Sequence, residues 1–351
     1  MRKPTKRGQK IRDFLLQQAH NHPRNLASVT CKHFGISRQA VNRYIRELVD
    51  KGYIVARGNT SQRRYTLNVL HKEGFTVPLS DLQEDLVWRS RVAPLLSKLP
   101  ENVLDIWQYS FTEMVNNAID HSNGTTLLVV IEINAFQVEI MVQDDGVGIF
   151  RKIKDECHLE DERHAVLELA KGKLTTDPER HTGEGIFFTS RMLDDFAILS
   201  GEVCFTHKYG EEEDWIFQRG RRDSGTSVFM FLANNSKRTS QDVFDRFASE
   251  ADDYGFTKTV VPVRLVRHGV EKPVSRSQAK RLLARIDRFN IVIFDFADVD
   301  SIGQAFADEI FRVFERGHPN VRFITMNTLP GVDRMIARAR SVPVEQTEQP
   351  A

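Results

Sequence analysis

Apolar residues recur at helical spacing in three short segments near the start of the chain. A proline, a glycine and a serine at the ends of these segments are residues that stop or cap helices. Two short runs of β-branched and aromatic residues follow, separated by a polar, basic turn. The pattern predicts three helices and a β-hairpin, at 7–21, 26–34, 38–51, 53–55 and 65–67.

A longer patterned stretch lies near the middle of the chain. Apolar residues between 111 and 119 recur at helical spacing, and Glu113 and Asn117, four residues apart, share one side of the predicted helix. Mg²⁺ requires oxygen ligands from a few side chains, completed by phosphates and waters. An acid and an amide on a helix side that must also face the core therefore predict a magnesium site.

Two β-branched runs, 125–133 and 136–142, follow as a predicted hairpin, and the second leads into the sequence D-D-G-V-G-I. Its glycines, Gly146 and Gly148, would let the backbone approach a flat ligand closely. The leading acid, Asp144, can accept a hydrogen bond from an exocyclic amine such as that of adenine. The stretch therefore favours binding of a flat ligand that carries an amino group.

Four motifs in this order resemble the Bergerat-fold ATPases of the GHKL superfamily: Glu-x-x-x-Asn, Asp-x-Gly-x-Gly, Gly-x-Gly and Gly-Thr, over about residues 100–232. The resemblance implies an α/β sandwich that binds ATP with Mg²⁺. It implies that Asn117 chelates the metal, that Asp144 binds the adenine amine, and that a glycine-rich lid clasps the triphosphate. The binding residues that it implies are Asn117, Asp144, Gly146, Gly148, Thr182, Gly183, Gly185 and Thr226.

A charged, helix-forming segment, 150–172, precedes the third motif, and a loop with the composition of a mobile lid follows at 173–185. Such loops commonly close over phosphates and exclude water. Lys171, Lys173 and Arg180 are candidate donors to phosphate oxygens.

ATP hydrolysis requires a group that orients or deprotonates the attacking water. Glu113 is the candidate general base, because family members that hydrolyse ATP carry this acid one turn before the asparagine. An anti-sigma-type serine protein kinase stays open as an alternative, since N-A-I-D-H-S resembles those kinases, and so does a nucleotide sensor without turnover. A histidine kinase is disfavoured, because His71 is the only histidine between Thr66 and Trp107 and a glycine interrupts its flank.

Strands and helices alternate between residues 242 and 343, which predicts a parallel or mixed sheet. The run I-V-I-F-D-F-A-D-V-D-S-I-G-Q-A-F resembles STAS-like domains. In the phosphorylated members an acceptor serine opens the next helix, but that place falls at Gln304 or Ala305 here, and Ser301 lies too early. The resemblance therefore favours a module that binds a protein partner over a phosphorylated switch.

Charge is distributed unevenly along the chain. The first 70 residues contain 15 Lys and Arg against 3 Asp and Glu, although the whole chain has a net charge of +1. A cationic head on an anionic body is typical of a nucleic-acid-binding domain joined to another unit.

The three helices and hairpin resemble a winged helix-turn-helix, which implies binding to double-stranded DNA. Outward residues of the third helix can read base edges, and basic residues of the wing suit phosphates. A basic surface for protein or RNA contacts is the alternative. The predicted DNA-binding residues are Arg38, Gln39, Asn42, Arg43, Arg57, Arg63 and Arg64.

The 351 residues have a hydrophobic content of 40%, with no apolar run long enough to span a bilayer and no apolar region behind the basic start. Three widely spaced cysteines argue against a disulfide framework. Together these features predict a cytoplasmic protein without membrane contact. A homodimer is consistent with winged-helix domains that bind paired half-sites.

The predicted fold class is multidomain α+β: a winged helix, a Bergerat α/β sandwich and a small STAS-like α/β domain. The favoured function is a DNA-binding regulator in which Mg-ATP drives a switch. The predicted winged helix, connector helix, ATPase domain, STAS-like domain and disordered tail are 1–70, 71–100, 101–233, 242–343 and 344–351.

Overall fold

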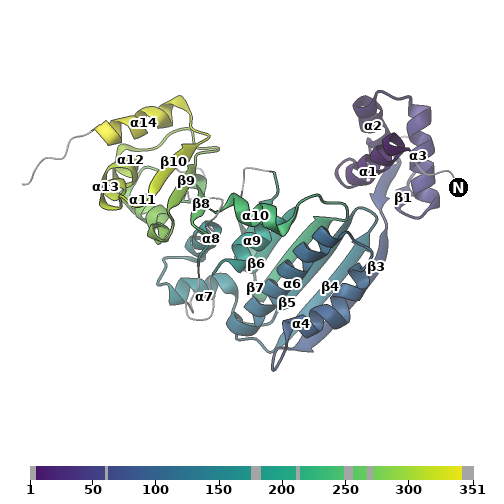
Figure 1. Ribbon diagram of the computed structural model, residues 1–351, viewed down its shortest axis with the longest axis horizontal. Helices are drawn as coiled ribbons and strands as arrows, with labels where there is room; N and C mark the ends of the chain where they lie inside the picture. Colours follow the sequence, from purple (N-terminus) through teal and green to yellow (C-terminus); the bar gives the residue numbers. More distant parts are fainter. Residues whose placement is uncertain are drawn as a thin grey trace, which may run out of the picture.

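The computed structural model describes residues 5–59, 62–174, 183–210, 214–248, 256–266 and 272–341. They form an N-terminal unit (5–67), a middle unit (69–248) and a C-terminal unit (256–341), with the middle unit between the other two (Figure 1). The predicted tail, 344–351, lies outside the described residues. Among the residues that the structure describes, no helix combines the length and the apolar composition that a membrane span requires.

The N-terminal unit has the predicted helices and hairpin. Ser37 caps the third helix, because its side-chain oxygen accepts a hydrogen bond from the Ala40 backbone N–H at 3.2 Å. Gly35 ends the second helix with a φ of 62°, a conformation that glycine adopts without strain. The elements are α1 (Lys6–Asn21), α2 (Leu26–Phe34), α3 (Arg38–Asp50), β1 (Ile54–Arg57) and β2 (Arg64–Leu67).

The segment after the hairpin differs from the prediction of a connector helix over 71–100. Residues 69–78 instead form β3 (Val69–Pro78), which continues almost directly from β2 and pairs antiparallel with the middle sheet. Phe75 lies opposite Val129 and Val77 opposite Leu127, so alternate side chains reach the core. Helix begins only afterwards, with α4 (Glu84–Val87), a π-helical turn (Trp88–Val92) and α5 (Ala93–Leu96).

Five strands form the sheet of the middle unit, in the order β3-β4-β5-β7-β6. All neighbouring pairs in this sheet are antiparallel. The turn between β4 and β5 lies close to the predicted place, and the Asn134 side chain accepts hydrogen bonds from the backbone of Phe136 and Gln137. The remaining strands are β4 (Thr126–Asn134), β5 (Gln137–Asp144), β6 (Asp195–Lys208) and β7 (Asp214–Ala233).

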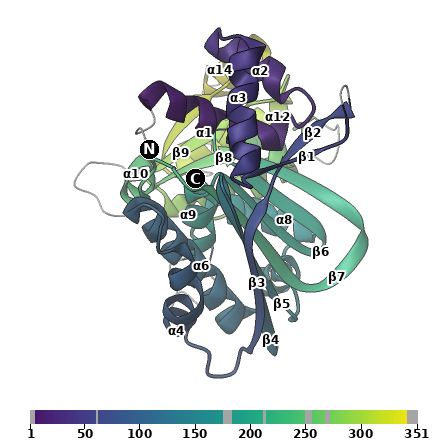
Figure 2. The ribbon, with the colours of Figure 1, turned by 90° about the vertical axis from the view of Figure 1, so that its right-hand side faces the viewer.

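Helices cover one face of this sheet, with α4 and α6 on the same side (Figure 2). The long helix α6 (Glu101–His121) buries Trp107, Phe111 and Val115 completely. The predicted helical segment 150–172 is divided in two, because the chain turns between Glu156 and Glu162. The other helices are α7 (Ile149–Glu156), α8 (Glu162–Lys171), α9 (Gly185–Met192) and α10 (Ser240–Arg246).

The C-terminal unit has a three-stranded sheet in the order β10-β9-β8, and both pairs are parallel, as the alternation of elements predicted. Val292 and Phe294 of the central strand are completely buried. The elements are β8 (Lys258–Pro262), a 3-10 turn (Val263–Val266), α11 (Arg276–Leu283), a 3-10 turn (Ile286–Arg288), β9 (Ile291–Asp295), α12 (Gln304–Asp308), a π-helical turn (Glu309–Phe314), α13 (Glu315–Gly317), β10 (Arg322–Met326) and α14 (Pro330–Ser341).

Candidate functional site

A cavity of about 280 Å³ lies in the middle unit between the helices α6, α7, α8 and α9, the end of β5 and the Thr226–Val228 part of β7. Its walls are mainly aliphatic, and a few polar groups converge on it, which is the usual composition of a small-molecule site. The polar residues that line it are Glu113, Asn117, His121, Ser122, Asp144, Lys152 and Thr226.

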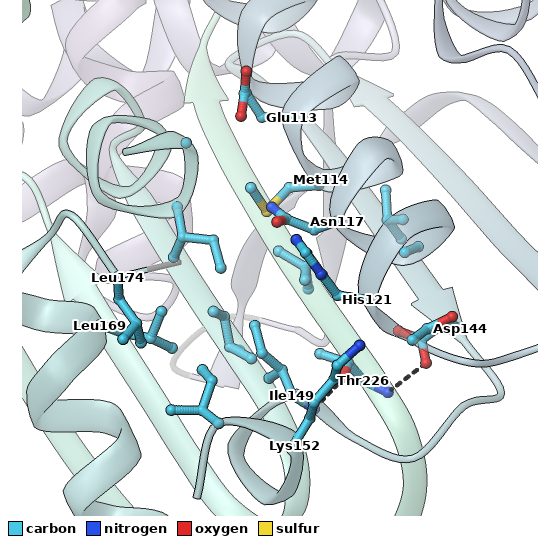
Figure 3. Close-up of a pocket in the computed structure, with 18 of the residues that line it drawn as sticks. Glu113, Met114, Asn117, His121, Asp144, Ile149, Lys152, Leu169, Leu174 and Thr226 are labelled. Atoms are coloured by element: carbon cyan, nitrogen blue, oxygen red, sulfur yellow. Dashed lines mark hydrogen bonds between the residues drawn. The ribbon is translucent and has the colours of Figure 1, made fainter. Parts of the chain in front are cut away.

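Helix α6 supplies one polar side of the cavity. Glu113, Asn117 and His121 follow one another at intervals of four residues, so they lie one turn apart and reach the same cavity (Figure 3). The structure thus brings Glu113 and Asn117 together as their spacing predicted. His121 continues the same spacing, but the prediction did not include it.

Asp144, at the end of β5, lies at the other side of the cavity from Glu113 (Figure 3). Its side chain is 6% exposed, and one carboxylate oxygen accepts hydrogen bonds from the backbone N–H of Gly146 at 2.9 Å and of Thr226 at 3.3 Å. Burial raises the pKa of Asp144, and the two backbone hydrogen bonds oppose that rise.

Glycines bring backbone segments into direct contact around Asp144. A Cβ atom at Gly146 would lie 2.0 Å from the carbonyl oxygen of Ser122, and one at Gly225 would lie 2.0 Å from that of Asp144. Thr226 then accepts a hydrogen bond from the Ile149 N–H at 3.0 Å, at the start of α7. The Asp-x-Gly-x-Gly and Gly-Thr motifs therefore form one connected structure, although about 80 residues separate them.

The Gly-x-Gly motif lies against Glu113. A Cβ atom at Gly185 would lie 1.9 Å from a Glu113 carboxylate oxygen, so a side chain at this position would displace the Glu113 carboxylate. Gly183 also lines the cavity. Burial and the nearby carboxylates of Glu113 and Glu184 raise the pKa of Tyr109. Two further predicted residues, Thr182 and Arg180, lie outside the described residues.

Two lysines predicted as phosphate donors do not face the cavity. The Lys171 ammonium, which is almost completely buried, donates to Glu168 and to two backbone oxygens of the C-terminal unit. Lys173 donates to the backbone oxygen of Arg288 at 3.2 Å. These two candidate donors contact the C-terminal unit instead, because tertiary contacts and not sequence position set the direction of a side chain.

Lys152 also lines the cavity, and the prediction from the sequence did not include it. It lies on α7, its side chain is 14% exposed, and it is 3.7 Å from the Glu156 carboxylate. Its position three residues after Ile149, on the first turns of a helix that begins at the glycine motif, could have indicated it.

Asp145, the second acid of the motif, bonds to the backbone and hydroxyls at the start of β4. Its carboxylate accepts hydrogen bonds from the backbone and the hydroxyl of both Thr125 and Thr126. These bonds hold the pKa of Asp145 well below its usual range, the backbone of Thr126 contributing most. Asp145 therefore anchors the start of β4.

A second candidate site lies on the N-terminal unit. The seven predicted residues are exposed: Arg38, Gln39, Asn42 and Arg43 on α3, and Arg57, Arg63 and Arg64 on the hairpin. Arg57 lies directly opposite Arg64, a like-charge pair that is unfavourable without an anion nearby. Arg24 lines the same shallow hollow as these two, and the sequence reading did not include it.

Comparison with protein families agrees with the two ends of the chain. Residues 15–55 match a family described as winged helix-turn-helix DNA-binding. The N-terminal unit is a winged helix-turn-helix of the DNA-binding type. Residues 278–333 match a family described as a STAS-like domain of unknown function (DUF4325), so the C-terminal unit is a STAS-like domain. No curated protein matches the chain.

These two matches confirm the predicted winged helix and the predicted STAS-like domain. Neither match includes residues of the middle unit. In the STAS-like domain Gln304 is the first residue of α12 and Gly303 precedes it as the cap. The predicted acceptor position therefore does open a helix, and its side chain is an amide that cannot be phosphorylated as a serine can.

Proposed function

We propose that this protein is a DNA-binding regulator whose middle unit binds Mg-ATP and hydrolyses it. One observation carries the proposal: Asp144, Asn117 and Glu113, from two separate elements, line one largely aliphatic cavity. The order of the four motifs, which resembles GHKL ATPases, supports the same reading. In this proposal nucleotide binding changes how the units of the chain dock.

The adenine would lie between the aliphatic walls, with its amino group donating to Asp144. Val142, Ile149 and Ile198 supply apolar surface to the same cavity as that carboxylate. Because an ionised carboxylate accepts and a protonated one donates, binding should weaken as the pH falls through the raised pKa of Asp144. Wyman linkage gives the same sign, since the bound state favours the deprotonated acid.

The phosphates would lie toward α6. Asn117 would hold Mg²⁺ through its amide oxygen, with phosphates and waters as the other ligands. Glu113, one turn away, would orient or deprotonate the attacking water. Lys152 adds positive charge to the cavity, which favours an anionic ligand.

The nucleotide proposal is tested with γ-labelled ATP and the pure full-length protein, with and without duplex DNA. We expect released phosphate. Stable label on the protein would support the protein kinase instead, and binding without either product would support a nucleotide sensor. No binding at all would contradict the proposal.

Variants of α6 assign the roles. Asn117→Ala should weaken Mg-ATP binding more than about 100-fold, since even outer-shell partners of metal ligands contribute about 10- to 100-fold. Glu113→Gln should keep binding and slow turnover about 100- to 10,000-fold. Asn116→Ala is the matched control, because this asparagine is on the same helix but does not line the cavity. Equal loss of binding in Asn117→Ala and Glu113→Gln would contradict the role of Glu113.

For DNA, we propose that the exposed residues of α3 read base edges in the major groove and that those of the hairpin contact phosphates. Arg43→Ala should cost about 1–3 kcal/mol of duplex binding. Arg151→Ala removes the same charge from an exposed place on α7 and serves as the control. If both variants bound duplex DNA with equal affinity at moderate salt, Arg43 would not be a DNA-contacting residue. A homodimer on paired half-sites is part of this proposal.

A further inference from the structure

Two helices of the middle unit have both a cavity side and a side against the STAS-like domain. Leu169 of α8 and Ile186 of α9 line the cavity, together with Leu174 and Gly185. The buried side chains of the middle unit and of the STAS-like domain form one continuous core. Part of the cavity wall is therefore only one helix thick, with the STAS-like domain behind it.

The end of α8 is fixed to the STAS-like domain by a buried lysine. The Lys171 ammonium donates to Glu168 at 2.7 Å and to the backbone oxygens of Arg281 and Ala284, each at 2.9 Å. An ammonium has three donor hydrogens, and these three bonds use all of them. Two of them end on the segment that closes α11, so this lysine joins the units directly.

Further contacts continue along the chain after Lys171. The Thr259 hydroxyl, on β8, donates to the Lys171 backbone oxygen at 2.6 Å. Gly172 has a φ of 83°, and a Cβ there would lie 2.5 Å from the Phe256 ring. Lys173 and Arg288 each donate to the other's backbone oxygen, at 3.2 and 3.0 Å. The chain that leads from α8 to Leu174, a cavity residue, thus runs along the STAS-like domain.

The start of α9 is attached to the same domain by aromatic packing. Phe187 and Phe188 follow Ile186 directly, and their rings lie 4.6 and 4.9 Å from that of Phe256. Phe256 contacts Phe289 at 5.2 Å, beside the Ile286–Arg288 turn of the STAS-like domain. Edge-to-face and tilted ring pairs of this kind have specific geometry, so a shift of one ring displaces its neighbours.

We propose that the STAS-like domain positions the α8 and α9 wall of the cavity, so that its docking on the middle unit and nucleotide binding are thermodynamically linked. The linkage rests on the proposed function, because it names the regulation of the same site. The docked state fixes Leu169, Leu174 and Ile186 for the ligand. A released STAS-like domain would free both helix ends and lower the affinity. Conversely, bound nucleotide must strengthen docking by the same factor.

The reciprocal effect gives two measurements on the full-length protein. Thr259→Val removes the hydroxyl that donates to the Lys171 backbone oxygen and keeps the side-chain shape. We expect this variant to bind Mg-ATP about fivefold more weakly or worse, because fivefold is the lower end of typical allosteric coupling between two sites. Thr325→Val, on the far edge strand β10, is the matched control and should bind as the unchanged protein does. Saturating Mg-ATP should slow amide hydrogen exchange in β8 and α11 of the unchanged protein.

The outcomes separate the two proposals. Unchanged affinity in Thr259→Val, or unchanged exchange in β8 and α11 at saturation, overturns the linkage and leaves nucleotide binding intact. Failure of the unchanged protein to bind Mg-ATP overturns both. If Thr259→Val does not fold, the hydrogen-exchange measurement on the unchanged protein alone decides whether docking of the STAS-like domain and nucleotide binding are linked.

Discussion

The winged helix and the STAS-like domain are joined to the middle unit in different ways. The winged helix has a core of its own, and the middle unit reaches it mainly through Ala135 and Phe136, at the turn between β4 and β5. The STAS-like domain shares one core with the middle unit and is fixed by the buried pair of Lys171 and Glu168. A domain with a separate core can move as a body, whereas one with a shared core cannot move without repacking.

This difference indicates how a ligand in the cavity would act on each end. Its effect on the STAS-like domain passes through one layer of packed side chains. Its effect on the winged helix must pass along the sheet, to the Phe136 turn or through β3 into β2. If a ligand binds in the cavity, we therefore expect the STAS-like domain to respond to it more directly than the winged helix.

The largest expected effect is at the STAS-like junction. Lys171→Met leaves the Glu168 carboxylate 2% exposed, with Arg285 at 3.5 Å as remaining cation, and should destabilise the protein by about 3 kcal/mol. Lys72→Met breaks an exposed pair with Glu132 and should cost under about 1 kcal/mol. Urea unfolding followed by tryptophan fluorescence reports this, since all three tryptophans lie after residue 70. Equal costs would contradict the shared core.

A smaller effect is expected at the winged-helix junction. Phe136→Ala removes a half-buried ring from the winged-helix core and should cost about 1–2 kcal/mol, below the value for a fully buried phenylalanine. Unfolding of the winged helix, followed by far-UV circular dichroism, should then separate from the tryptophan transition. Phe217→Ala, at a residue that is 49% exposed, should leave the two transitions together. If Phe136→Ala shifted only the tryptophan transition, the ring would stabilise the middle unit and not the winged helix, which would contradict the comparison of the two junctions.

The smallest effect is a pH dependence confined to the winged helix. Hydrogen bonds from Arg12, and then from Lys51, lower the pKa of Glu47 to about 2. A lowered carboxyl pKa contributes stability above the unfolded value of 4.5, and this is lost as the pH falls from there toward 2. The pair is partly exposed, so the loss should be about 1 kcal/mol or less. Melts of Glu47→Gln should lack this part of the acid dependence, and an unchanged acid profile would refute the assignment.

Local patterns in the sequence predicted much of the secondary structure. The caps at Ser37 and Gly35 and the helical spacing of apolar residues gave the three helices of the winged helix, because these signals act within a few residues. The spacing of Glu113 and Asn117 gave their common side of α6 for the same reason. The strand β3 was missed, since its alternation is short and mostly exposed and its place depends on pairing with β4.

What the sequence alone determined, then, was local: the helices and hairpin of the winged helix, the charged residues on its surface, and the glycine and acid motifs of the cavity. Tertiary structure alone decided that Asp144 and Thr226 meet, that β3 joins the sheet, and that Lys171 turns from the cavity to the STAS-like domain. The physical reason is that periodicity and capping depend on neighbours in the chain. The partner of a buried charge or an edge strand comes from residues far away in sequence, and only the folded chain brings them together.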